Sequence, residues 1–178
     1  MNVLVTGAPG SGKTSLVKGA HKQNDKQLFD TDEIPRLCEW REYTTGKILG
    51  LVTEYKATGD EWYTKYGWYW NINILTQFLK NNPDAILCGS SENVVECYQY
   101  FDKIFLLKKT EQELLNNLAS PERVNPFGKT PEQRKNFLNW QNHLIKGLEK
   151  YKHTILHGNE IRNSYSDIRE QLKIKLRI

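Results

Sequence analysis

The sequence predicts an α/β domain in which a five-stranded parallel sheet lies between two layers of helices. Short apolar runs alternate with stretches of helical periodicity, which is the pattern of βαβ units. The first apolar run also leads directly into a glycine-rich loop and then a helix, and the length of 178 residues fits one domain, 1–178. The predicted strands are 3–6, 27–29, 85–88, 104–107 and 154–156, and the predicted helices are 14–22, 70–79, 111–118, 132–151 and 165–176.

Each predicted strand is short and rich in β-branched residues or leucine, as buried strands are. The first is built on Val3, Leu4 and Val5 and the fourth on the run "IFLL". Two segments interrupt the alternation, a Trp- and Tyr-rich segment at about 36–70 and a Pro- and Gly-containing segment at about 119–134. Long connections in a compact α/β domain are usually functional. We therefore expect a substrate-side insert in the first and a lid in the second.

Composition excludes several classes of protein. The net charge of +4 suits a phosphate-bearing partner but is too small for a dedicated nucleic-acid binder. The three cysteines lack metal-binding spacing and are expected to be reduced thiols in a cytoplasmic protein. No apolar run reaches the ~18 residues of a membrane span, and we expect no signal peptide.

The glycine-rich loop has the full phosphate-loop pattern, with Gly7 followed by Gly12, Lys13 and Thr14 at the required spacing. Glycines let the backbone turn its N–H groups toward an anion, and the following helix directs its positive end to the same point. Lys13 is expected to reach the β- and γ-phosphates, and the Thr14 hydroxyl is expected to bind Mg²⁺. The residues expected to contact the nucleotide are Gly7, Pro9, Gly10, Ser11, Gly12, Lys13, Thr14 and Ser15.

The stretches "VLVTGAPGSGKTSL" and "LFDTDEIPRL" together resemble the small P-loop kinases. This group includes nucleoside monophosphate kinases, shikimate and gluconate kinases, and the kinase domain of polynucleotide kinases. The resemblance covers the layout of the whole chain. It implies a three-layer αβα fold with strand order 2-3-1-4-5, a helical acceptor insert, a short lid, and ATP with Mg²⁺.

Two carboxylates follow the second predicted strand, at Asp30 and Asp32. Ligands of doubly wound sheets lie beyond the carboxyl ends of the strands. By its likeness to the Asp-Ser-Asp of shikimate-kinase-like chains, Asp30 is assigned to the metal and Asp32 to the acceptor hydroxyl. The alternative is that Asp32 only caps a helix. Arg36 would project from the same helical face as Asp32 and bind an acidic or phosphorylated acceptor, or it would form a surface ion pair with a nearby glutamate.

Two further features belong to the acceptor side. Gly89 and Ser90 follow the third strand, where related kinases carry glycines at the acceptor site; the alternative is that Ser90 and Ser91 cap the next helix. The aromatic stretch "EWYTKYGWYWNINIL" could stack on a flat acceptor such as a nucleobase, and we assign Trp70 to that role. The alternative is that its rings only pack on a helical insert.

The predicted lid carries Arg123, Lys129 and Arg134. Cations on such a loop can stabilise the charge that develops in phosphoryl transfer. The family's short lids make Arg123 the first candidate and Arg134 the second, against a solvated loop without a role. By the same resemblance, Gly158 and Asn159 are expected near the adenine ring.

These expectations favour an ATP-dependent phosphotransferase acting on a small molecule, with a nucleoside or nucleotide as acceptor. A polar metabolite resembling shikimate or gluconate comes second, and a polynucleotide 5′-hydroxyl comes third. A nucleotide-binding switch is the alternative of another class, although the sequence has no guanine-specific Asn-Lys-x-Asp element.

Overall fold

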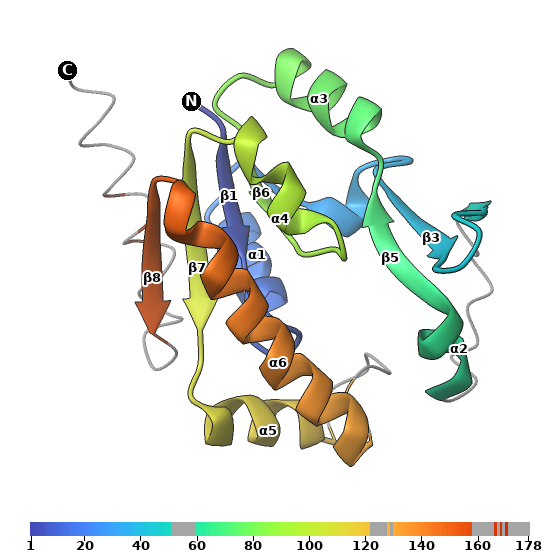
Figure 1. The fold of residues 1–178 in the computed structure, drawn as a ribbon. Helices are drawn as coiled ribbons and strands as arrows, with labels where there is room; N and C mark the ends of the chain where they lie inside the picture. The colour runs from blue at the N-terminus through green and yellow to red at the C-terminus, as the bar shows by residue number, and fades with distance from the viewer. Residues whose placement is uncertain are drawn as a thin grey trace.

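The computed structural model describes residues 1–50, 60–121, 128, 130–157, 166, 168 and 170, apart from the side chains of 50, 60, 61 and 63. The main sheet consists of five strands that are parallel throughout (Figure 1). Its spatial order is β2-β6-β1-β7-β8, which is 2-3-1-4-5 when these five strands are counted along the chain. The predicted fold class and strand order are therefore confirmed. The strands are β1 (Val3–Thr6), β2 (Leu28–Asp30), β6 (Ile86–Cys88), β7 (Lys103–Lys108) and β8 (His153–His157).

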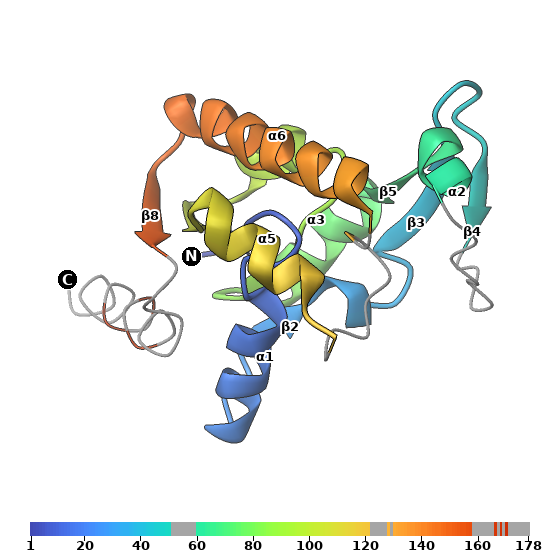
Figure 2. The same cartoon turned by 90° about the horizontal axis from the view of Figure 1, so that it is seen from below.

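Alternate residues of the strands supply two cores, one on each face of the sheet. Leu4, Leu87 and Ile104 pack on one face under α3, α4 and α6. Val5 and Phe105 point to the other face, which α1 covers. Figure 2 shows α6 and α1 on opposite sides of the sheet. The helices are α1 (Lys13–Lys22), α3 (Ile72–Asn81), α4 (Val94–Cys97), α5 (Glu111–Ala119) and α6 (Pro131–Gly147).

The insert corrects one expectation, because it is mainly a sheet and not helical. β3 (Cys38–Glu42) lies between β4 (Ile48–Gly50) and β5 (Tyr66–Trp70) in a three-stranded antiparallel sheet beside the main one (Figure 1). Its one described helix is the short α2 (Asp60–Lys65). Trp40 stands opposite Trp68, and aromatic cross-strand pairs of this kind stabilise strands. Helix α3 accordingly begins only at Ile72, after its cap at Asn71.

The helices on the lid side begin at strong caps. Thr110 and Glu113 form a capping box at the start of α5, and the Thr130 hydroxyl accepts from the amide of Gln133 at the start of α6. Helix α6 ends at Gly147, earlier than predicted, and continues as a 3₁₀ turn, Leu148–Lys150. Most of the predicted helix 165–176 lies outside the described residues.

Within the described part of the chain, none of the helices combines the length and apolarity that crossing a bilayer requires.

Candidate active site at the phosphate loop

The loop between β1 and α1 adopts the conformation that its glycines permit. Gly10 and Gly12 have φ of 86° and 105°, a left-handed region that side chains other than glycine rarely enter. A Cβ at Gly7 would lie 2.5 Å from the Ser11 hydroxyl and 2.7 Å from the Leu107 carbonyl. The loop is therefore folded so tightly that only glycine fits at its first position.

The polar groups of the loop fit a nucleotide triphosphate. The Lys13 ammonium donates to the Gly7 and Ala8 carbonyls at 2.6 and 3.1 Å, which holds it over the loop. The Ser11 hydroxyl is buried and has no hydrogen-bond partner in the described residues. Thr14 and Ser15 stand exposed in the first turn of α1, where helical N–H groups lack intrahelical acceptors. The unpartnered hydroxyl and these N–H groups are suitable donors for phosphate oxygens.

A further helix, not singled out in the sequence, supports the loop from outside. The Leu118 side chain of α5 lies 3.2 Å from the position of a Cβ at Gly10, and the Asn117 amide donates to the Gly10 carbonyl at 2.9 Å. Leu114 and Leu118 share a buried cluster with Ala8 of the loop. The helical periodicity of α5 was visible in the sequence, but its partner was not.

Strand pairing places the two predicted carboxylates near the loop. Asp30 on β2 stands level with Cys88 on β6, and Cys88 stands level with Val5 on β1. The Cys88 thiol donates to the Lys13 carbonyl at 3.7 Å. Only β6 therefore separates the carboxyl end of β2 from β1, the strand that leads into the phosphate loop.

Asp30 is the residue that caps the turn after β2, and this corrects the alternative in which Asp32 is the cap. Its Oδ1 accepts from the Asp32 amide at 3.0 Å, at the start of the 3₁₀ turn Thr31–Glu33. Burial raises the pKa of Asp30, and the charges of Asp32 and Glu33 raise it further. The bond from the Asp32 amide and the Lys13 charge act in the opposite direction. A cation beside this carboxylate would favour its ionised form.

Asp32 is held through one of its two oxygens. Its Oδ1 accepts from the Trp68 indole at 3.3 Å, and the Cys38 thiol lies between this oxygen, at 3.6 Å, and the Thr31 carbonyl, at 3.3 Å. The side chain is otherwise exposed. Burial and the nearby Asp32 charge raise the pKa of Cys38, so the thiol remains a protonated donor. Asp32 therefore presents an oriented carboxylate to solvent.

Trp68, and not Trp70, is the insert tryptophan that reaches the site. The side chain of Trp70 is fully buried in the main core, so it does not line an open site in this structure. Trp68 and Trp70 lie on the same face of β5, but Trp70 is fully buried and Trp68 is only partly buried. Strand alternation could have grouped the two residues, but the helical expectation for this segment concealed that signal.

Arg36 lies in a turn, which corrects the expectation that it shares a helical face with Asp32. The Leu37 amide donates to the Ile34 carbonyl at 3.1 Å, and Arg36 between them has a φ of 63°. Its side chain is exposed and forms no ion pair with any described residue. Glu39 pairs with Arg41 at 2.5 Å. The glutamate-pair alternative for Arg36 is therefore not observed.

The segment after β6 packs closely against the turn after β2. A Cβ at Gly89 would collide with the Thr31 hydroxyl, so only glycine allows this approach. The Ser90 hydroxyl is buried without a hydrogen-bond partner in the described residues, and it is a candidate contact for an acceptor. The helix-cap alternative for Ser90 and Ser91 is not observed, because α4 begins at Val94 with no side-chain cap.

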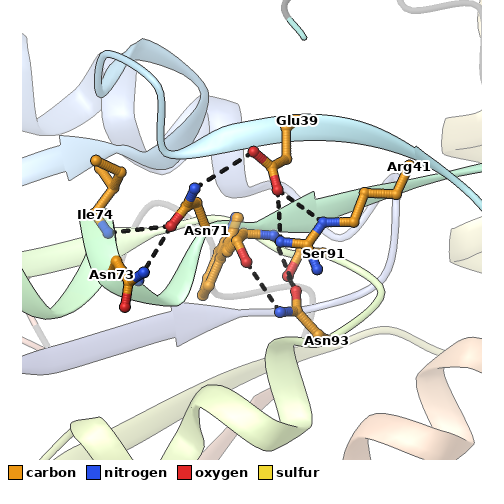
Figure 3. Close-up of polar contacts among 8 residues, drawn as sticks. Glu39, Arg41, Asn71, Asn73, Ile74, Ser91 and Asn93 are labelled. Atoms are coloured by element: carbon orange, nitrogen blue, oxygen red, sulfur yellow. Dashed lines mark hydrogen bonds and ion pairs between the residues drawn. The ribbon is translucent and has the colours of Figure 1, made fainter. Parts of the chain in front are cut away.

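A buried polar network joins the small sheet to this segment. The Ser91 hydroxyl donates to Asn93, whose amide group bonds both the N–H and the carbonyl of Trp70 at 2.9 and 3.0 Å. Glu39, only 8% exposed, accepts from Arg41 at 2.7 Å and from Asn71 at 3.5 Å (Figure 3). The network fixes the edge of β5 against the end of β6, and thereby the position of Trp68.

Of the three cationic residues of the predicted lid, the structure describes Arg134, which is anchored near α5. The Arg134 Nε donates to the Gly128 carbonyl at 2.9 Å, and the Gly128 amide donates to Gln133 at 2.8 Å. A Cβ at Gly128 would lie 2.7 Å from Leu118, the residue that also contacts the phosphate loop. Arg134 thus bonds to Gly128, Gly128 packs on Leu118, and Leu118 in turn contacts the phosphate loop. The predicted site residues Arg123, Lys129, Gly158 and Asn159 lie outside the described residues.

The side chains near the phosphate loop offer few ligands for a magnesium ion. The described residues contain no group of three or more acidic, histidine or cysteine side chains able to hold a metal. They do offer the Thr14 hydroxyl and the Asp30 carboxylate. Mg²⁺ in kinase sites is held by one or two such protein groups together with substrate phosphates. The residues therefore fit a magnesium ion that binds with the nucleotide.

Comparisons with known proteins show which class this fold belongs to. No protein-family model and no curated protein matches the chain. Among solved structures, deoxyadenosine kinase from M. mycoides with bound dATP is similar with a TM-score of 0.55 and 12% identity, covering 97% of this chain and 100% of that one. Shikimate kinase from Acinetobacter baumannii in complex with shikimate has a TM-score of 0.58 and 14% identity, with 98% and 93% coverage. Shikimate kinase from Bacteroides thetaiotaomicron has a TM-score of 0.57 and 16% identity, with 97% and 98% coverage.

These neighbours are P-loop kinases, and the likeness extends over nearly their whole length. The chain therefore has the fold of the small P-loop kinases.

Proposed function

We propose that the protein is an ATP-dependent kinase that transfers the γ-phosphoryl group to a hydroxyl of a small acceptor. The acceptor oxygen forms a bond to the γ-phosphorus, the bond from that phosphorus to the β,γ-bridging oxygen breaks, and ADP leaves. The hydroxyl proton passes to the Asp32 carboxylate and then to solvent. The observation that carries this proposal is the pairing of β2, β6 and β1, which brings an oriented Asp32 to the same sheet edge as the phosphate loop.

The donor side of the proposed reaction uses the loop and the start of α1. Backbone N–H groups and the Ser11 hydroxyl bind phosphate oxygens, and Lys13 exchanges its bonds to loop carbonyls for bonds to the β- and γ-phosphates. Mg²⁺, when bound with the nucleotide, neutralises phosphate charge, and we assign Thr14 and Asp30 to it. Pro9 and Ser15 complete the contacts, and Gly158 and Asn159 are assigned to the adenine side.

The acceptor side uses exposed and unpartnered groups around Asp32. Ser90 offers a buried hydroxyl without a described partner, Gly89 allows close approach, and Arg36 offers an exposed guanidinium. We assign Arg134, together with Arg123 from the lid, the role of stabilising the negative charge that develops on the transferred phosphoryl group.

The aromatic face of the small sheet favours a nucleoside or nucleotide as the acceptor. Trp40, Trp68 and Trp62 form a continuous ring cluster, with ring centroids 5.0 and 5.7 Å from that of Trp40, and Trp68 reaches Asp32. Stacking of a base on such rings contributes about 1–3 kcal/mol. A polar metabolite is the second candidate, supported by the Ser90 hydroxyl and the likeness to shikimate kinases.

The test is ATP consumption against a panel of acceptors. The panel contains nucleosides, nucleoside monophosphates, sugar acids, shikimate and a 5′-hydroxyl oligonucleotide, each with Mg²⁺ and ATP. Turnover that requires one of these acceptors supports the kinase. ATP binding without turnover on any acceptor would instead favour a nucleotide-binding switch.

We predict that Lys13→Ala lowers turnover by about 10²-fold or more, because the ammonium stabilises charge on the transferred group. The thermal unfolding midpoint should stay near that of the wild type, since the bonds that the ammonium donates to Gly7 and Ala8 lie within the loop. Lys18→Ala, exposed on the same helix, is the matched control and should retain wild-type turnover. Full activity of Lys13→Ala would contradict the donor assignment.

We predict that Asp32→Asn lowers kcat by about 10²-fold while the KM for ATP stays within a factor of two. The amide retains the shape of the carboxylate but is a far weaker base. Glu33→Gln removes the neighbouring exposed charge and serves as the control. If Asp32→Asn changed only the unfolding midpoint, Asp32 would be structural.

A further inference from the structure

We infer that Trp68 is a positioning residue for Asp32: its indole N–H fixes one carboxylate oxygen and leaves the other to accept the proton of the acceptor hydroxyl. This inference rests on the proposed function. It concerns a residue of the insert that contacts no reacting atom itself, and it assigns the insert a part in the chemistry.

The two oxygens of Asp32 are treated differently by the protein. Oδ1 accepts from the Trp68 indole at 3.3 Å, whereas the Cys38 thiol, 3.6 Å away, has one proton and lies closer to the Thr31 carbonyl, at 3.3 Å. Oδ2 accepts no hydrogen bond from the residues that the structure describes. An exposed aspartate otherwise rotates freely about its terminal torsion, which is broad and roughly two-fold. The indole N–H on Oδ1 therefore favours one orientation of the carboxylate and leaves Oδ2 available.

The indole is itself held firmly enough to act as a positioning group. Its ring packs on Trp40 with a centroid distance of 5.0 Å and lies against the main core. The Trp68 carbonyl accepts from the Glu92 amide at 2.7 Å, which ties β5 to the segment after β6. Rigid support behind a reacting group matters because small displacements cost large factors in rate.

Packing alone would not require this arrangement. A phenylalanine could fill the apolar part of the Trp68 site, but it has no N–H to direct at Asp32. The orienting bond comes from the one polar atom of the tryptophan side chain. The interaction can therefore be removed without removing the ring.

The decisive substitution replaces Trp68 with 3-benzothienylalanine, in which sulfur takes the place of the indole N–H and the shape is preserved. With the panel acceptor that gives the highest rate, kcat should fall about tenfold, since a hydrogen bond to a charged group is lost. The KM for ATP should stay unchanged. Trp68→Phe should give the same split between kcat and KM. The same analogue at Trp140, which lies on α6 and stacks on His143, is the control and should retain wild-type kcat.

A second measurement tests the hydrogen bond in the protein without substrates. The indole ¹H–¹⁵N resonance of Trp68, assigned by its loss in Trp68→Phe, should shift in Asp32→Asn and stay in place in Glu33→Gln. An indole resonance that keeps its chemical shift in Asp32→Asn would overturn the inference. Wild-type kcat in the Trp68 analogue would also overturn it, while leaving the proposed function intact. A wild-type protein without turnover on any panel acceptor would overturn the proposed function, and the inference with it.

Discussion

Arg36 has a backbone conformation that its side chain does not favour. A φ of 63° is the left-handed region, and it costs a residue with a Cβ roughly 1–2 kcal/mol. Pro35 before it suits the first central position of a type II turn, whose second central position prefers glycine or asparagine. Strain of this kind persists where the surroundings require it, and it concentrates at functional sites. An exposed arginine here, four residues after Asp32, supports a role in holding the acceptor.

We predict that Arg36→Gly makes the protein more stable and a poorer enzyme. Relief of the left-handed strain, partly offset by the greater freedom of an unfolded glycine, should raise the free energy of unfolding by about 0.5–1 kcal/mol. Loss of the guanidinium should raise the KM for the acceptor about tenfold. Urea unfolding and steady-state kinetics measure the two effects. Arg36→Ala keeps the strain and loses the charge, so it should raise the KM without the gain in stability.

The small sheet and helix α5 show how elements were predicted with unequal success. The strands of the main sheet follow from short continuous apolar runs that are buried on both faces, and the helices α1, α5 and α6 follow from helical periodicity, because each buries one apolar face. The insert strands did not, since Trp68, Tyr69 and Trp70 are consecutive aromatic residues, and so short an unbroken run has no period that distinguishes a strand from a helix. What decided the outcome was pairing with Cys38–Glu42, a non-local contact that no single window contains.

Helix α5 carries a pH-dependent start. The Thr110 hydroxyl and amide both donate to Glu113, at 2.7 and 2.8 Å, and these bonds lower the pKa of Glu113 from its usual value of 4.5. A pKa lowered by folding contributes stability that is present above the unfolded value and is lost as the pH falls through the folded value. The helix that supports the phosphate loop is therefore best anchored at neutral pH.

We predict that Glu113→Gln lowers the urea midpoint at pH 7 and that the difference from wild type shrinks at a pH well below the usual pKa of 4.5. Glu111→Gln lies in the same helical turn outside the capping box and is the control for general helix-end charge effects. An equal loss of stability at both pH values would show that the carboxylate charge of Glu113 has no part in the effect.

At the scale of the whole molecule, the sequence predicts the phosphate loop in full and the proposed acceptor side only in part. The phosphate loop is a contiguous motif whose backbone geometry is set by its own glycines, so its residues could be named at once. Asp30 and Asp32 could also be named, but their distinct roles could not, because the cap at Asp30 and the Trp68 bond to Asp32 depend on folded geometry. The sequence-based assignment of Trp70 to acceptor stacking fails because the sequence does not reveal which of the two rings, Trp68 or Trp70, the core covers.

The three cysteines are distributed through both cores, and we predict that all of them resist Ellman's reagent in the folded protein. All three are buried, and burial is the first cause that raises the pKa of Cys88 and of Cys97 to about 12, as it also raises that of Cys38. At mildly alkaline pH the reactive thiolate is therefore scarce. Three thiols should react after denaturation in guanidinium chloride. Rapid reaction of one thiol in the native protein would show that one of these regions opens readily.

The small sheet leaves the core and returns to it at almost the same point, where the Asn71 amide donates to the Leu37 carbonyl at 2.7 Å. This hydrogen bond fixes the point at which the chain returns to the main sheet and its helices. When the two ends of a loop are held together, each doubling of the loop length costs only about 0.6 kcal/mol of loop-closure entropy. The segment between Leu37 and Asn71 can thus be lengthened without moving its two ends, provided that Cys38 and Trp70, which belong to the main core, are kept.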